Sequence, residues 1–317
     1  MSLLPFTEPP PSDTPLEPAP VHPTPRVDLR RGTMWMIFSL VFFTGNSLLI
    51  KHMATDRHID PWLIVSFRFG VGLFFTAAIF LPAGTLSVRR SFMSWLLASR
   101  GVMGAFATAA YYFSIGPLGA GKSTLIGNTW CVWSAIMATV VLKEHLSFSK
   151  LLGILIAVGG LMLLMDLSPA ALAVNGKWEA VSLGGAVVAA AVVVVVRQLT
   201  KTETSPTIFA SQCIYGLLLC VPMALCQAIH LTALDIGLLC LAGLCAAVGQ
   251  LSMTEGFRFL TIAAGGAFQL TLPLVIALGG VLLFNETFSL PQMLGAGLIL
   301  LGSFQTIAGG RWGKGNK

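Results

Sequence analysis

Charged residues are scarce in this sequence. Asp, Glu, Lys and Arg together make up 10% of the 317 residues and apolar residues make up 55%, whereas about a quarter of a soluble domain is charged. There are too few polar side chains to cover the surface of a water-soluble particle of this size. Most of the protein surface therefore has to face lipid. The composition therefore excludes an ordinary soluble enzyme.

Cysteine pairs with metal-ligand spacing are absent as well. The six cysteines lie within or beside apolar runs, so neither a zinc site nor a disulfide framework is indicated. Residues 1–30 hold nine of the seventeen prolines but no apolar segment, and no signal peptide is expected there. We predict no metal and no cofactor, and we assign residues 1–32 to a disordered, proline-rich cytoplasmic tail.

Runs of about twenty apolar residues begin at Thr33 and recur along the rest of the chain. Each is long enough to cross a hydrocarbon core of about 30 Å, and a helix satisfies its own backbone hydrogen bonds there. The alternation typical of a membrane β-barrel is missing. The sequence therefore predicts an all-α membrane protein with ten transmembrane helices, followed by a basic cytoplasmic tail at 309–317. The spans are predicted near residues 33–51, 61–82, 93–115, 120–142, 149–166, 180–198, 207–229, 235–256, 261–284 and 290–308.

Lys and Arg residues are distributed unevenly between the two sides of the predicted membrane. With a cytoplasmic N-terminus, thirteen of the nineteen lie in cytoplasmic segments and four in external ones. Because these residues resist translocation, we expect both termini in the cytoplasm of an integral, multi-pass protein of a bacterial inner membrane. The same bias explains the net charge of +6 without a nucleic-acid partner. The thirteen are Arg26, Arg30, Arg31, Arg89, Arg90, Lys143, Lys150, Arg197, Lys201, Arg258, Arg311, Lys314 and Lys317.

An internal repeat relates residues 129–160 to residues 271–302. The alignment pairs Thr129 with Thr271 and Glu144 with Glu286. Because five spans is an odd number, the second copy has to cross the membrane in the opposite sense, which predicts two inverted five-helix repeats at 33–167 and 180–308. Inverted repeats are a recurrent transporter design, since exchanging the conformations of two equivalent halves opens a midplane site to either side. Further identities pair Ser147 with Ser289, Leu152 with Leu294, Gly153 with Gly295 and Gly160 with Gly302.

The segments LKEHLS and FNETFS, between the fourth and fifth span of each half, resemble a known family. With the glycine-bearing helices that follow them, and with Arg68 in SFRFG, they are similar to the drug/metabolite transporter superfamily, specifically its ten-helix group with two EamA domains. The resemblance covers residues 33–308 and implies a metabolite carrier with a central cavity lined mainly by spans 1, 3, 4, 6, 8 and 9. That family often has a proline in the fourth helix of each half. Pro273 fills this place in the second half, and Cys131 stands there in the first.

The segment GPLGAGKS, residues 116–123, matches the phosphate-binding pattern GxxxxGK[ST]. A phosphate-binding loop follows a buried strand and precedes an amphipathic helix at an aqueous site. The segment TLIGNTWCVWSAIMATVV that follows here contains no charged residue. We therefore expect no nucleotide at this segment and interpret it as a tight glycine turn on the outer face.

Two arginines lie within predicted spans. Arg68 follows Pro61 by seven residues, about 10 Å into the membrane at 1.5 Å per residue. A charge at that depth is a functional candidate, although a guanidinium group can also tie helices together through their carbonyls. Arg100 is expected to extend its side chain to the cytoplasmic face.

Neutral polar and aromatic residues within the spans form the predicted substrate cavity. Aromatic faces with a few polar groups suit an amphipathic small molecule, whereas the same residues also serve in packing or in interhelical hydrogen bonds. Asn128 and Gln269 are almost repeat-equivalent and are expected near the pseudo-twofold centre. The predicted cavity residues are Asn46, Arg68, Tyr111, Tyr112, Asn128, Trp130, Gln250 and Gln269.

Carboxylates are missing from the middle of every predicted span. Only Glu255 lies inside one, near its cytoplasmic end, which disfavours proton antiport and the binding of a cation by a deep acid. We predict a carrier that moves an amino-acid-like, zwitterionic, anionic or neutral amphipathic solute by alternating access, through facilitated diffusion or exchange, with a homodimer left open.

Two other classes stay open beside the carrier. A membrane-embedded enzyme would need an intramembrane nucleophile and base, and the five histidines lie in the tail, the loops or the span ends. We therefore predict that the protein is not an enzyme. The second alternative is a non-transporting membrane subunit.

Overall fold

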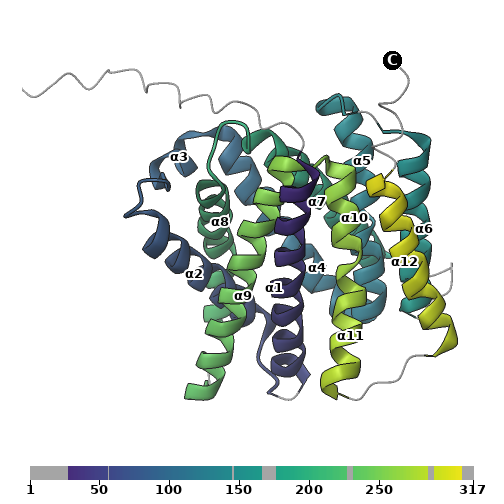
Figure 1. Ribbon diagram of the computed structural model, residues 1–317. Coiled ribbons are helices and arrows are strands. Elements are labelled where there is room, and N and C mark those ends of the chain that lie inside the picture. The colour runs from purple at the N-terminus through teal and green to yellow at the C-terminus, as the bar shows by residue number, and fades with distance from the viewer. Residues whose placement is uncertain are drawn as a thin grey trace, which may run out of the picture.

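The computed structural model describes residues 28–55, 57–144, 146–165, 176–226, 231–284 and 289–308, and these contain twelve helices and no strand (Figure 1). The predicted all-α fold is confirmed. By length and composition, six helices in this part of the chain are suited to cross a membrane. They are α1 (Leu29–Thr55), α2 (Pro61–Phe80), α7 (Lys177–Leu199), α8 (Ser205–Leu225), α9 (Ala233–Phe259) and α12 (Leu290–Ala308).

The other six helices complete the ten predicted spans. The ninth span is divided into α10 and α11, while α4 holds the third span and the start of the fourth, which α5 completes. The fifth span is α6, and α3 is a short helix before α4. Their bounds are α3 (Val88–Met93), α4 (Trp95–Asn128), α5 (Trp130–Val141), α6 (Phe148–Leu164), α10 (Ile262–Leu270) and α11 (Leu272–Phe284).

Several helix starts follow from capping residues. The Asp60 side chain accepts a hydrogen bond from Trp62 N, and Pro61 occupies the first position of α2, where a missing N–H costs nothing. Thr232 and Asp235 form a reciprocal capping box at the start of α9. These side chains satisfy N–H groups that would otherwise be unpaired at the helix ends.

The predicted glycine turn at residues 116–123 lies inside α4. The backbone keeps helical hydrogen bonding from Trp95 to Asn128, but the Tyr111 ring lies 3.4 Å from the position of a Cβ atom on Gly127. In a straight helix these two residues would be about 24 Å apart at 1.5 Å per residue, so the chain turns back between them. The segment is preceded by helix, not by the strand of a phosphate-binding site.

The fourth span of each half is interrupted at the same place in the repeat. Thr129 separates α4 from α5, and Thr271 separates α10 from α11. The Thr129 hydroxyl donates to Ile126 O at 2.6 Å and the Thr271 hydroxyl donates to Phe268 O at 2.7 Å. Both halves break although only the second has a proline, so a proline is not required for a break at this place.

Helices α6 and α12 pack through glycines that the repeat makes equivalent. A Cβ atom on Gly160 would lie 2.6 Å from Gly295 O, and one on Gly153 would lie 2.6 Å from Gly302 O. Because Gly153 corresponds to Gly295 and Gly160 to Gly302, each contact is the repeat image of the other. Such an exchange of partners indicates a twofold relation between the helices. The order of the contacts along the chain shows that the two helices are antiparallel. The second repeat is therefore inverted relative to the first.

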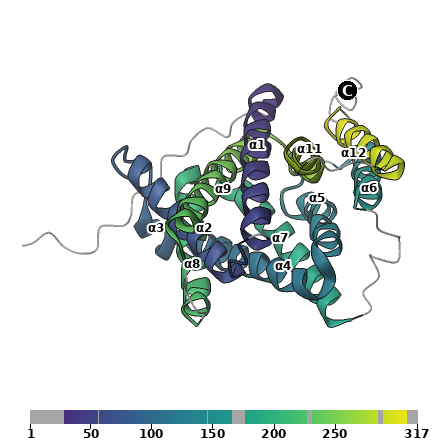
Figure 2. The ribbon, with the colours of Figure 1, turned by 90° about the horizontal axis from the view of Figure 1, so that it is seen from below.

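The two chain ends described lie at one end of the bundle (Figure 1). Asp28 N, just before α1, donates to Phe259 O at the end of α9, and Thr306 near the end of α12 donates to Lys150 O at the start of α6. We call this the basic end, because Arg30, Arg90 and Arg197 also lie there. Seen along the bundle, α6 and α12 form one edge and α2, α3 and α8 the other (Figure 2).

The predicted proline-rich tail ends earlier than residue 32. Residues 29–32 are the first turn of α1, and Gly32 packs against the Leu260 side chain. Contact with the end of α9 fixes these residues as helix. Residues 1–27, residues 309–317 and Glu286 lie outside the part that the structure describes.

Candidate functional site

Two of the predicted cavity residues form hydrogen bonds between helices. Gln269 in α10 is 6% exposed, and its Nε2 donates to Ser39 Oγ of α1 at 3.3 Å. Asn46 is buried in α1, and its Nδ2 donates to Ala242 O of α9 at 2.9 Å. Gln269 thus joins a polar pair near the break in the ninth span, whereas Asn46 ties α1 to α9.

Four other predicted residues surround the break in the fourth span. Asn128 ends α4, and Trp130 begins α5 and packs against the buried apolar clusters around it. The Tyr111 ring faces Gly127, two residues before the break at Thr129. Trp130, Tyr111 and Asn128 are all half-buried. The side chain of Tyr112 lies outside the part that the structure describes.

Gln250 is the predicted residue whose hydrogen-bonding capacity is left open. It is 5% exposed in α9, and its Nε2 has no partner among the described residues. A buried amide without a partner costs free energy, so its donors remain free for a ligand or a bound water.

A cavity of about 230 Å³ lies between α2, α4 and α8. None of the predicted residues whose side chains the structure describes lines it. Trp62 and Phe113 meet edge to face across it with their ring centroids 4.9 Å apart, which makes its wall largely apolar. The lining residues are Asp60, Pro61, Trp62, Val65, Ala109, Phe113 and Cys220.

Arg100 does not extend to the membrane surface, so that prediction is wrong. The residue is 2% exposed, and its Nη2 donates to Gln212 Oε1 of α8 at 2.8 Å. The amide on the facing helix and the space beside Gly104 hold the guanidinium group inside the bundle. Its Nε and Nη1 have no partner among the residues described.

Glu144 of the LKEHLS segment joins the two halves at the basic end. Its Oε2 accepts from Ile262 N at the start of α10 at 3.0 Å, and its Oε1 lies 3.5 Å from Arg197 Nε of α7. Arg197 Nη1 donates to Phe257 O and Arg258 O, each at 2.6 Å. An acid at a helix start and a base at a helix end both complement the helix dipole, so these contacts fasten α7, α9 and α10 to the first half.

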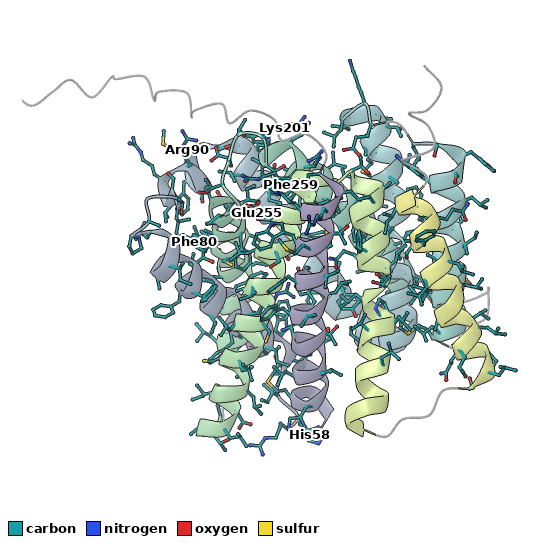
Figure 3. The ribbon with its side chains drawn as sticks, viewed as in Figure 1. His58, Phe80, Arg90, Lys201, Glu255 and Phe259 are labelled. Atoms are coloured by element: carbon teal, nitrogen blue, oxygen red, sulfur yellow. The ribbon has the colours of Figure 1, made fainter. Side chains whose placement is uncertain are left out.

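A second group of contacts continues this connection. Glu203 pairs with Arg90 of α3 at 3.3 Å, and the Glu203 carbonyl accepts from Arg258 at 3.1 Å. Arg258 also pairs with Glu255, which accepts from the Ser205 hydroxyl at 2.5 Å. Glu255 therefore lies at the end of the bundle with its charge compensated (Figure 3). We call the group Arg90, Glu144, Arg197, Glu203, Ser205, Glu255 and Arg258 the basic-end network.

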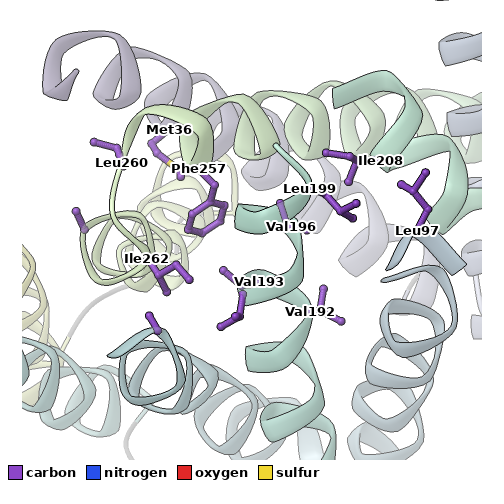
Figure 4. Packing of buried hydrophobic residues seen from close by; sticks show 13 residues of the cluster. Met36, Leu97, Val192, Val193, Val196, Leu199, Ile208, Phe257, Leu260 and Ile262 are labelled. Carbon is purple, nitrogen blue, oxygen red and sulfur yellow. The ribbon is translucent and has the colours of Figure 1, made fainter. Parts of the chain in front are cut away.

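Buried apolar side chains lie directly beside the basic-end network. Val196 precedes Arg197, and Phe257 precedes Arg258. With Ile262 and Val193 they converge from α7, α9 and α10 in one cluster (Figure 4). Charge pairs and apolar packing together hold α7, α9 and α10 against one another at this end of the bundle.

The opposite end has a smaller charged contact. Arg57 Nε donates to Asp235 Oδ1 at 2.8 Å, which links the loop after α1 to the first turn of α9. The hydrogen bond and the charge of Asp235 raise the pKa of the Arg57 guanidinium above its ordinary value. The pair therefore stays ionised at neutral pH.

Sequence reasoning missed the importance of Arg100, Gln212 and Arg197. Gln212 is an amide within an apolar run and could have been noticed, but its span was not expected to line the cavity. Arg197 was counted only for its charge. Its partners lie 53 residues before it and 60 residues after it in the chain, so its position in the sequence did not indicate its role.

These features define the class of protein: a multi-pass membrane protein built from two inverted five-helix repeats. The chain belongs to the EamA-like transporter family, whose model matches residues 30–166 and 176–308. It is thus a member of the drug/metabolite transporter superfamily and a membrane transporter of small solutes. No curated protein matches the chain.

A solved structure titled "Crystal structure of protein" is similar in fold. The TM-score is 0.77 at 14% sequence identity, and the match covers 89% of this chain and 98% of that one. At this level of identity the likeness concerns the fold alone.

Proposed function

We propose that the protein carries a small organic solute across the membrane by alternating access. The observation that supports this most directly is the exchange of glycine partners between α6 and α12, because it relates the two halves by an inverted twofold axis. Two such halves can adopt each other's conformation, and the exchange moves the opening from one face to the other.

The basic-end network is proposed to act as a gate, and this structure is proposed to have that gate closed. Glu144 of the first half bonds to the start of the ninth span in the second half. Glu286 is its repeat equivalent and is proposed to close the opposite end in the same way once the basic end opens. The matching breaks at Thr129 and Thr271 are the points about which the fourth and ninth spans bend.

Polar groups near the two breaks are proposed to line the path of the solute. Gln269 and Ser39 supply one hydrogen-bonding pair, Gln250 supplies an amide with free donors, and Trp130 and Tyr111 offer aromatic faces. A few polar groups among apolar walls suit an amphipathic solute. The basic end is proposed to face the cytoplasm, because Lys and Arg accumulate there.

Solute exchange in proteoliposomes tests the carrier. Vesicles containing the purified protein and preloaded with amino acids, nucleosides or organic acids are expected to accumulate the labelled form of one class. Uptake should be faster than in vesicles without internal solute and should not require a proton gradient. Strict dependence on that gradient would contradict exchange.

A second result distinguishes a carrier from a non-transporting subunit. A carrier binds its solute in the folded state and should melt at a higher temperature in its presence. If no solute of any class is exchanged or raises the melting temperature, the carrier proposal fails.

A further inference from the structure

We propose that the transported solute carries a carboxylate or similar oxyanion, and that Arg100 binds it with Gln212 and Arg68 between α2, α4 and α8. This inference rests on the proposed function, because the anion is taken to be part of the solute. It assigns a site that the sequence did not predict, apart from Arg68.

The first observation is the state of the Arg100 guanidinium. It is buried at 2% exposure and donates one hydrogen bond, to Gln212, while Nε and Nη1 have no partner in the part of the chain described. Removing an ion from water costs several kcal/mol unless its charge and its hydrogen bonds are matched. Several N–H groups of the buried Arg100 guanidinium are therefore available to bind an acceptor.

The second observation is the surplus of positive charge around that group. Arg68 and Arg100 both lie close enough to Cys213, and to each other, for their charges to interact. None of the helices α2, α4 and α8 contains an Asp or Glu residue. Asp60 precedes α2 and caps that helix through Trp62 N. An anion from outside the chain would match the two cations.

The third observation is the space left for the guanidinium. Gly104 lies one turn along α4, and a Cβ atom there would collide with Arg100 Nη1 and lie 3.4 Å from Gln212 Nε2. The bare backbone at Gly104 therefore allows the guanidinium to lie beside the amide. A planar guanidinium with open N–H groups matches the oxygens of a carboxylate in geometry as well as in charge.

The cavity between the same three helices fits the apolar part of such a solute. Val65, on its wall, precedes Arg68 by one helical turn, and Cys220 follows Cys213 by two turns. Its volume of about 230 Å³ is below that of drug-sized sites, so it suits a small organic acid. The aromatic pair of Trp62 and Phe113 would contact the hydrocarbon body.

Matched acid and amide pairs test the chemistry directly. The melting temperature of the purified full-length protein is measured with phenylacetate against phenylacetamide, and with butyrate against butyramide. The acids are expected to raise it by several degrees at tens of millimolar, and the amides by less than one degree. Equal shifts with acid and amide, or no shift with any acid, would overturn the proposal.

Arg100→Gln is the decisive variant. It should lose the shift with the acids, while its melting temperature without ligand should equal or exceed that of the wild type, because an unmatched buried charge is removed. Arg100→Lys keeps the positive charge but not the planar, bidentate guanidinium group. It should retain a reduced shift in melting temperature with the acids. Arg89→Gln, which removes an exposed arginine of α3, is the matched control and should retain the full shift.

Other outcomes separate this proposal from simpler roles and from the carrier itself. If Arg100→Gln melts lower and keeps the shift, Arg100 only ties helices together. If sodium chloride produces the same shift as the acids, the site holds an inorganic anion and the proposal is overturned. If the protein exchanges a neutral solute and Arg100→Gln does not affect that exchange, the oxyanion-site proposal is overturned and the carrier proposal stands. An acid-specific shift without exchange of any solute would contradict the carrier, and with it the idea that the bound acid is transported.

Discussion

Inside lipid, a polar side chain needs a partner on a neighbouring helix, a bound water or a ligand. Asn46 has such a partner on α9, whereas Gln250 on α9 and the Arg100 guanidinium retain open donors in the part of the chain described. Residues of the same chemical kind therefore have different roles. Only their surroundings separate packing from binding.

Replacing Asn46 and Gln250 by leucine should give opposite results. Asn46→Leu loses the bond to Ala242 O and is expected to destabilise the protein by about 1 kcal/mol, in the range of hydrogen bonds between membrane helices. Gln250→Leu removes an amide without a partner, so its stability should be unchanged or higher, and its solute-dependent shift should fall. Both are measured as melting temperatures with and without a solute that binds. If Asn46→Leu lost the solute-dependent rise in melting temperature and Gln250→Leu kept it, Asn46 would be the binding residue and Gln250 would not.

At the level of whole helices, the repeat controls both the packing and the breaks. Gly153 and Gly160 let α6 approach α12 so closely that each glycine lies against a backbone carbonyl of α12. Small residues favour such close packing in membranes. Thr129 and Thr271 end their helices with the same hydrogen bond. Equivalent residues make equivalent structure in the two halves.

Gly160→Ala should lower the stability by about 1–3 kcal/mol, because the added methyl group would overpack the contact with α12. Gly159→Ala is the matched control: apart from the backbone of its own helix, no described atom lies within 4 Å of its added Cβ, and alanine is the better helix former. Its melting temperature should be equal or slightly higher. Equal losses in both variants would show that close approach to α12 is not the cause.

Cys131→Pro should be tolerated. Cys131 is the second residue of α5, as Pro273 is of α11, and an N–H in the first turn has no partner within its own helix. The expected change in stability is below about 1 kcal/mol, whereas Ala135→Pro in the interior of α5 should cost about 3 kcal/mol or more. Expression and melting temperature of the two variants check this. Unfolding of Cys131→Pro would mean that the two breaks are not interchangeable.

At the level of the whole molecule, the proposed mechanism lets contacts between the halves decide which end is closed. The basic-end network joins Glu144 of the first half to α7, α9 and α10 of the second, and an apolar cluster lies beside it (Figure 4). Breaking such contacts should shift the protein toward conformations that are open at this end.

Glu144→Gln should increase the labelling of Cys131 by a water-soluble maleimide. Cys131 is 1% exposed in α5, beside Gly266 of α10. Losing hydrogen bonds to a charged group costs about 1.5–3 kcal/mol, so labelling about tenfold faster or more is expected, followed by mass spectrometry of that residue. Asp28→Asn removes an exposed pair with Arg31 at the same end and should have no effect. An unchanged rate in Glu144→Gln would contradict the gate.

The sequence by itself determined the membrane environment, the ten spans and the repeat, because these depend on the length of apolar runs and on the spacing of a few identical residues. It also indicated Glu144 and the paired glycines, although it did not show what they contact. The glycines at residues 116–123 indicated where the chain turns back, although the backbone keeps helical hydrogen bonding there.

Only the tertiary structure decided which polar groups have partners. Arg100 was expected at the membrane surface, but an amide 112 residues away in the chain holds it inside. Asn46 was expected in the cavity, and its side chain joins two helices across 196 residues. Burial and pairing arise between helices that are distant in the chain. Periodicity and composition describe each helix alone, so they leave its partners undetermined.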